Sequence, residues 1–168
     1  MDLIHEGDDW RLRLATPSDS DRLCEIFRQI DMDAPLSITE ERDPNFFALL
    51  NMHCGSVYTK IYEDITREKP YIFGCGSVIS REAWINGEKS KVGYACDLRI
   101  GAEYRHGKIF PTGLQKFIDY VAEAENLDAM YFAILSENTR AKQAFFSPSG
   151  YRKNQPIVKT MTPYNMVS

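Results

Sequence analysis

The stretch Val92–Leu114 constrains the fold more than any other part of the sequence, because it joins an apolar, strand-like run to a short basic turn and the start of a helix. Between Arg99 and Lys116 there are four formal cations and His106 against one carboxylate, Glu103, in a chain whose formal net charge is -4. A strand that ends in such a turn directs the free N–H groups of the next helix, and the positive end of its dipole, at one place. That place suits a phosphate group.

The residues of the turn fit this interpretation. Gly107 allows the backbone to approach a ligand closely, and Arg105 and Lys108 add full positive charges. The alternative is a surface turn that happens to be basic, and this stretch by itself leaves both possibilities open.

Composition limits the class of protein. With 168 residues, 43% hydrophobic and 26% charged, we expect one globular domain over residues 1–168. The acidic balance argues against non-specific nucleic-acid binding, and no apolar run approaches the roughly 20 residues of a membrane span. The first residues lack the basic start and apolar core of a signal peptide, so we expect a cytoplasmic protein without nucleic-acid or membrane partners.

Cysteine spacing predicts no metal site. The four cysteines are widely separated, and none forms a Cys-x-x-Cys pair or lies near a pair of histidines. We expect reduced, buried thiols.

Two motifs resemble those of the GCN5-related N-acetyltransferase (GNAT) family. The run Arg105-His-Gly-Lys-Ile-Phe resembles the family's loop Arg/Gln-x-x-Gly-x-Gly/Ala, which binds the pyrophosphate of acetyl-CoA. Downstream, Asn138-Thr-Arg-Ala-Lys-Gln-Ala-Phe-Phe, closed by Gly150-Tyr151, resembles the family's Asn-x-x-Ala-x-x-Leu-Tyr…Gly-Phe helix. The resemblance covers roughly Trp10 to Tyr164.

The resemblance implies an α/β (α+β) fold: a mixed, mostly antiparallel central sheet, a βαβ unit at its fourth and fifth strands, and helices on both faces. Local patterns agree with this order of elements. Strands are predicted over 10–15, 55–62, 71–85, 92–100, 131–135 and around 157–161, and helices over 17–30, 44–50, 111–126 and 138–147. Asn86-Gly87 predicts the hairpin turn before the fourth strand.

The resemblance also implies a cofactor, acetyl-CoA, and the residues that hold it. In the family a bulge splays the fourth strand from the fifth, which frees backbone groups for the pantetheine arm and thioester. The implied cofactor-binding residues are Leu98, Arg99 and Ile100 on the strand, Arg105, His106, Gly107, Lys108, Ile109 and Phe110 in the loop, and Asn138 on the following helix. For Asn138, the alternative role is a plain helix N-cap.

Catalysis of acyl transfer needs a base for the acceptor ammonium. Asp97 is the only carboxylate on the fourth strand, but the side of the strand that it faces stays open, and it is also a possible structural partner of Arg99. Glu82, on the preceding strand, is a further candidate that would act through water. Phe145 stands where the family usually has the Tyr that acts as the acid, so Tyr151 is the substitute, with Tyr94 as a further one. A packed aromatic is the alternative role for both tyrosines.

The resemblance, supported by the basic turn before a helix, implies an acetyl-CoA-dependent N-acetyltransferase that moves an acetyl group directly to a primary amine of a small molecule or peptide. One alternative is a module of the same fold that binds CoA or acyl-CoA without turnover. Others are an enzyme with a different acyl donor and one lobe of a larger acyltransferase. The strands at the sheet edges also make a homodimer possible.

Overall fold

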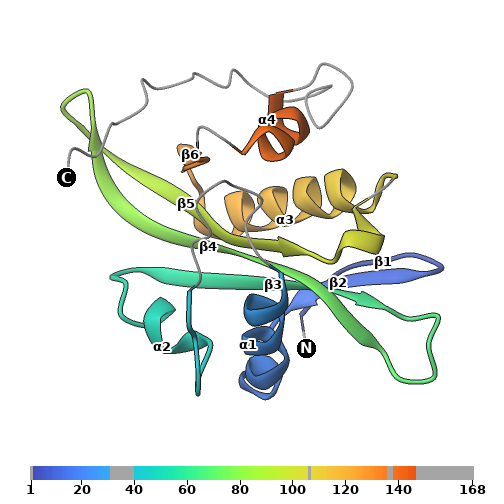
Figure 1. Cartoon of the computed structure of the whole chain (residues 1–168). Coiled ribbons are helices and arrows are strands. Elements are labelled where there is room, and N and C mark those ends of the chain that lie inside the picture. Colours follow the sequence, from blue (N-terminus) through green and yellow to red (C-terminus); the bar gives the residue numbers. More distant parts are fainter. Residues whose placement is uncertain (1, 31–39, 106, 136–137, 147–168) are drawn as a thin grey trace.

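The computed structural model of the chain describes residues 2–30, 40–105, 107–135 and 138–146 (Figure 1). Its described strands form one six-stranded sheet in the order β1-β2-β3-β4-β5-β6, antiparallel except between β5 and β6, which are parallel. The strands are β1 (Leu3–Glu6), β2 (Trp10–Leu14), β3 (Ser56–Asp64), β4 (Tyr71–Ile85), β5 (Glu88–Ile100) and β6 (Ala129–Phe132).

Helices cover both faces of this sheet. Figure 1 shows α1 (Ser20–Gln29) and α2 (Phe47–Leu50) on one face, which we call the α1 face. On the opposite face, the α3 face, lie α3 (Ile109–Glu125) and α4 (Thr139–Phe146). Single 3-10 turns precede α1 and α3, at Pro17–Asp19 and Ala102–Tyr104. The predicted fold class, with its βαβ unit formed by β5, α3 and β6, is confirmed.

Each face of the sheet has its own apolar core. On the α1 face, Leu23, Ile26 and Phe27 repeat at helical spacing along α1 and pack on β3 and β4. On the α3 face, Phe117 and Val121 pack against the sheet together with residues of β2 to β5.

Local sequence patterns located several elements correctly. Asn86 and Gly87 have φ values of +53° and +85°, and they close the β4–β5 hairpin that the sequence predicts. Asn126, with φ +51°, ends α3 in the left-handed conformation at the predicted place.

Other elements differ from the predictions. Strand β1 was not predicted, because its four residues are too few to show a period. The second helix is confirmed but spans four residues only. The fifth predicted strand begins earlier, at Ala129, and ends earlier, at Phe132, where the chain leaves β5. The last predicted strand, near residues 157–161, lies outside the described residues.

None of the described helices combines the length and the apolar character that crossing a membrane requires.

Candidate active site

A β-bulge in β5 shapes the centre of the molecule. Ser77 of β4 pairs with Cys96 and Cys75 pairs with Arg99, so two residues of β5, Asp97 and Leu98, lie opposite one residue of β4. Asp97 adopts φ +59°, an uncommon conformation for a residue with a side chain. The extra residue reverses the alternation of faces along the rest of the strand.

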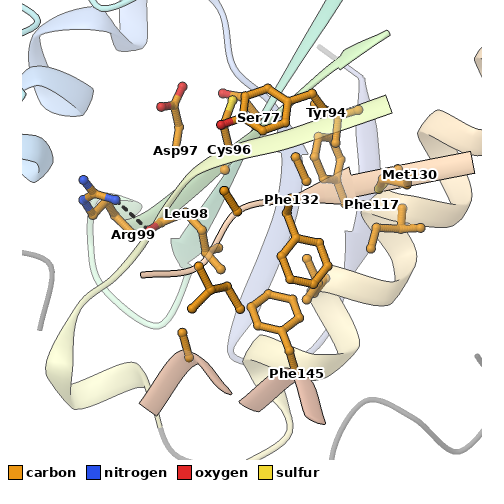
Figure 2. A pocket seen from close by; sticks show the side chains of 18 of the residues that line it. Ser77, Tyr94, Cys96, Asp97, Leu98, Arg99, Phe117, Met130, Phe132 and Phe145 are labelled. Atoms are coloured by element: carbon orange, nitrogen blue, oxygen red, sulfur yellow. Dashed lines mark hydrogen bonds between the residues drawn. The ribbon is translucent and has the colours of Figure 1, made fainter. Parts of the chain in front are cut away.

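The reversal decides where the side chains of β5 point. Cys96 and Asp97 both lie on the α1 face, and Figure 2 shows them on one side of the strand with Phe132 and Phe145 on the other. Leu98 packs into the core of the α3 face.

The sheet opens directly after this point. The parallel pairing between β5 and β6 extends from Val92↔Ala129 only to Ala95↔Phe132, so the β6-facing edge of β5 has no ladder partner beyond Ala95 within the described residues. A mostly apolar cavity of about 310 Å³ occupies the opening, and α3 and α4 contribute to its walls. The splayed strands that the resemblance implies are therefore present.

Asp97 lies on the wall of this cavity and is almost fully buried, with 6% of its side chain exposed. Arg42 donates a hydrogen bond from Nη2 to Asp97 Oδ1 at 2.8 Å, and the same nitrogen lies 2.8 Å from Glu40 Oε1. Asp97 Oδ2 is buried with no hydrogen-bond partner in the described part of the chain. Burial raises the pKa of Asp97, and the neighbouring Arg42 opposes that rise.

The partnership between Asp97 and Arg99, which the sequence left possible, is not formed. The Arg99 guanidinium lies 4.6 Å from the centroid of the Phe27 ring and donates to the Leu98 carbonyl oxygen at 3.0 Å. Arg42 is the partner of Asp97 instead, because the bulge turns Asp97 toward the segment before α2.

The basic turn before α3 lies beside the cavity. Arg105 donates from Nε to the Ile100 carbonyl oxygen at 2.8 Å, which ties the turn to the end of β5. Gly107 has φ +76°, and no atom lies within 4 Å of the place where a Cβ would stand. Lys108 is the exposed N-cap of α3, so the first-turn N–H groups of Ile109 and Phe110 have no partner within the helix.

The structure thus divides the predicted cofactor-binding residues into two groups. Leu98, Arg99 and Asn138 line the cavity, whereas Ile100 is buried in the sheet with its carbonyl bound to Arg105. The described loop residues, from Gly107 to Phe110 and Arg105, lie outside the cavity lining, at the start of α3. His106 and Tyr151 lie outside the described residues.

Helix α4 brings Asn138, at its start, and Phe145, near its end, to the cavity. Asn138 accepts a hydrogen bond from the Ala141 N–H at 2.9 Å, so it is an N-cap of α4 as well as part of the wall. The Phe145 ring lies 4.6 Å from that of Phe132 and 6.1 Å from that of Phe110.

One tyrosine and one cysteine of β5, Tyr94 and Cys96, also line the cavity. Tyr94 stacks on Tyr131, with 5.1 Å between the ring centroids. Burial raises the pKa of the Cys96 thiol, which keeps it protonated and unsuited to nucleophilic attack.

Arg42 and Lys60 line or support the cavity but were not predicted from the sequence. Arg42 belongs to an irregular acidic segment, and no local pattern connects it with β5. Lys60 is buried on β3, where its Nζ donates to the Tyr62 hydroxyl at 2.8 Å, and burial lowers its pKa to about 7. The alternation along β3 was a usable signal, because it places Lys60 on one face with Tyr58 and Tyr62.

No protein-family model matches the sequence, and no curated protein matches it. Solved structures do match. A tetramutant of the BH1408 protein from Bacillus halodurans is 19% identical with a TM-score of 0.65, and the match covers 89% of this chain and 99% of that one. Glucosamine-6-phosphate N-acetyltransferase from Arabidopsis thaliana is 16% identical with a TM-score of 0.57, over 94% and 99% of the two chains.

A predicted acetyltransferase from Clostridium acetobutylicum, solved with acetyl-CoA, is 13% identical with a TM-score of 0.60, over 93% and 96% of the two chains. At these identities the likeness concerns the fold: the chain has the GNAT fold.

Proposed function

We propose that this chain is an N-acyltransferase that moves an acyl group, acetyl in the simplest case, from a CoA thioester directly to a primary amine of a small molecule or peptide. One observation carries the proposal: the bulge in β5 opens the sheet beside β6, and a cavity fills the opening next to the basic N-terminus of α3. The fold shared with a structure that contains acetyl-CoA supports it.

The chain offers suitable groups for both ends of such a donor. The unpaired edge of β5 at Leu98 and Arg99 would hold the thioester and pantetheine arm by backbone hydrogen bonds. At the start of α3, the N–H groups of Ile109 and Phe110, together with Arg105 and Lys108, would hold the pyrophosphate. His106 of the same loop and Asn138 at the cavity wall complete the set that the resemblance implies.

Asp97 is the general base in this proposal. Its Oδ2 is buried beside the cavity and has no hydrogen-bond partner among the described residues, while Arg42 fixes the other carboxylate oxygen. Burial raises the pKa of Asp97 toward the range in which a base is effective. Asp97 takes a proton from the acceptor ammonium, the amine nitrogen bonds to the acyl carbon, the carbon–sulfur bond breaks, and the second amine proton goes to the sulfur or to solvent.

The proposed mechanism does not require a protein acid for the leaving sulfur. Phe145 offers no proton, so the sulfur leaves as a thiolate, which an ordinary thiol pKa of about 8.5 permits. Tyr94 lines the cavity and Tyr151 follows the motif, and both remain proposals for this role.

Two carboxylates on the cavity wall, one partly exposed and one buried, favour a cationic acceptor. Glu40 lines the cavity and is 37% exposed, close to the buried Asp97 through their shared partner Arg42. An ammonium group approaching from the α1 face meets both carboxylates.

The test measures release of free CoA from acetyl-CoA over a panel of primary amines, with wild type, Asp97→Asn and Glu82→Gln. Asn tolerates the left-handed backbone of position 97, so the first variant is expected to fold. Glu82, the other candidate base, is 67% exposed on the β4–β5 hairpin, pairs with Lys89 and is not part of the cavity lining, so it serves as the matched control. We expect Asp97→Asn to lower kcat by about 10²–10⁴-fold and to remove the loss of rate at low pH; a folded variant with wild-type kcat would eliminate Asp97 as the base.

A binding module without turnover is the second candidate, favoured by the phenylalanine in the acid's place. Thermal stabilisation by acetyl-CoA without CoA release for any amine would establish it. In both cases Arg105→Ala should weaken binding of acetyl-CoA, whereas Lys89→Ala should not.

A further inference from the structure

Two arginine side chains meet on the α1 face beside the cavity. The guanidinium carbons of Arg42 and Arg99 lie 5.3 Å and 4.6 Å from the centroid of the Phe27 ring. Arg99 lines the cavity, and Figure 2 shows its side chain on the same side of β5 as that of Asp97. The cavity wall therefore carries a cation, Arg99, as well as the carboxylates of Asp97 and Glu40.

The ion pairs at this place do not include Arg99. Arg42 Nη2 lies 2.8 Å from both Asp97 Oδ1 and Glu40 Oε1, so one guanidinium serves both carboxylates. Arg99 Nη1 donates to the Leu98 carbonyl oxygen at 3.0 Å, and Arg99 Nε is buried with no hydrogen-bond partner in the described part of the chain. Arg99 is thus a cation of the cavity wall that has no ionic partner at salt-bridge distance among the described residues.

Buried side-chain atoms without a hydrogen-bond partner gather at the same place. Five such atoms occur within the described residues, and four of them belong to Arg42, Asp97 and Arg99. Three of the four are guanidinium nitrogens, which donate, and the fourth is the carboxylate oxygen Oδ2, which accepts. Unpaired buried donors and acceptors are costly unless water or a ligand satisfies them. A ligand that offers both an anion and N–H groups suits this set.

Arg99 also stands at the reacting centre of the proposed transfer. It follows Leu98 in β5, and its Nη1 binds the carbonyl oxygen of that residue, whose backbone is proposed to hold the thioester. Asp97, the proposed base, comes two residues before Arg99, so their Cα atoms lie at most about 7 Å apart. The base and the cation are therefore close enough to hold two groups of one small acceptor.

We propose that the amine acceptor carries a carboxylate beside its ammonium group, and that this carboxylate binds the Arg99 guanidinium while the ammonium faces Asp97. Free α-amino acids are the class of substrate, because their nitrogen and carboxyl carbon lie only about 2.5 Å apart and can reach both side chains together. An acceptor with an ammonium group alone would bring a second cation up to Arg99 without a compensating anion. The inference rests on the proposed function, since it specifies the acceptor of the same site.

The test compares free α-amino acids with their α-carboxamides, which keep the ammonium group and the side chain and lose the charge of the carboxylate. Release of CoA from acetyl-CoA gives kcat/KM for each pair with wild type, Arg99→Met and Arg81→Met. We expect wild type to prefer the acid by about 10- to 100-fold, the range for a hydrogen bond to a charged group, and Arg99→Met to lose that preference. Arg81 is exposed on β4 outside the cavity lining, so Arg81→Met is the matched control and should keep the preference.

The reactivity of the amines themselves cannot imitate this result. The carboxylate of a free amino acid stabilises its ammonium group, so the amide offers more neutral amine at the same pH. The KM for acetyl-CoA should be unchanged in Arg99→Met, because only the backbone of position 99 is proposed to hold the donor. A raised KM for acetyl-CoA together with an intact preference for the acid would place the side chain in the donor site and overturn the inference.

Amides that match or exceed the acids with the wild type would overturn the inference and leave the proposed function intact. An equal loss for acid and amide in Arg99→Met would do the same, since it would show a structural role only. If no amine of any kind causes release of CoA, the proposed function fails together with the inference. The wild-type comparison needs no variant, so it decides the inference even if Arg99→Met does not fold.

Discussion

Replacing Lys60 by Met should make the protein more stable near neutral pH, and the gain should shrink as the pH rises. Methionine fills similar space without a charge to desolvate. In the folded protein burial lowers the pKa of Lys60 from 10.5 to about 7. Between these two values the unfolded chain holds a proton that the folded chain has released, so the lysine makes the free energy of unfolding rise with pH.

The size of the effect follows from the two pKa values. Each pH unit between the two pKa values adds at most about 1.4 kcal/mol to the free energy of unfolding of the wild type. From pH 7 to pH 9 this free energy should therefore rise by about 2 kcal/mol relative to that of Lys60→Met. Below about pH 6 the difference between the two proteins should be constant, because Lys60 is then protonated in both states.

Comparing the free energies of unfolding of the wild type and Lys60→Met separates the titration of Lys60 from other titrations between pH 6 and pH 9. The nearest titratable groups are the Tyr62 hydroxyl on β3 and the Cys75 thiol on β4, whose pKa burial raises to about 12, while Phe117 is the contact from α3. Both groups are present in both proteins, so their contributions cancel in the difference to first order.

Urea unfolding at pH 6, 7, 8 and 9 measures the difference. Lys89→Met is the matched control, because Lys89 is 57% exposed on the β4–β5 hairpin and its replacement should give a difference that is independent of pH. A difference for Lys60→Met that stays constant from pH 7 to pH 9 would refute the reasoning, since it would mean that the amine keeps its proton in the folded protein.

Three further predictions concern other sites. Glu125 accepts hydrogen bonds from Tyr58 at 2.6 Å and Ser80 at 3.0 Å and pairs with Lys91 at 2.6 Å, and these contacts lower its pKa from 4.5 to about 2. Glu125→Gln should therefore cost about 3 kcal/mol at pH 7 in urea unfolding, and the loss should shrink as the pH falls from 4.5 toward 2. Gly113→Ala should destabilise by roughly 1–3 kcal/mol although alanine favours helices, because its Cβ would stand 2.3 Å from Tyr62 Cε1; an equal or higher urea midpoint would contradict this. A thiol reagent applied to the native protein should label the exposed Cys54 and spare Cys24, Cys75 and Cys96, and mass spectrometry of the peptides would reveal any other order.

Several features could be predicted from the sequence because short-range physics decides them. The Asn86-Gly87 turn needs positive φ values, which these two residues adopt easily, so the β4–β5 hairpin could be placed. The apolar spacing of α3 and the left-handed Asn126 at its end are likewise local. The basic turn could be located because charge and glycine stand together along the chain. Asp97 could be named as a candidate base because it is the only carboxylate in the predicted strand 92–100.

By contrast, only the tertiary structure decided which groups Asp97 and Lys60 face. Alternation assigns sides of a strand until an extra residue intervenes, and the bulge opposite Gly76 depends on how β4 and β5 pair over their whole length. The bulge puts Asp97 on the side of Arg42, a partner 55 positions away, and turns Arg99 toward Phe27 instead. Lys60 became a buried amine because α3 packs over β3, and burial depends on contacts between distant segments that no local pattern records.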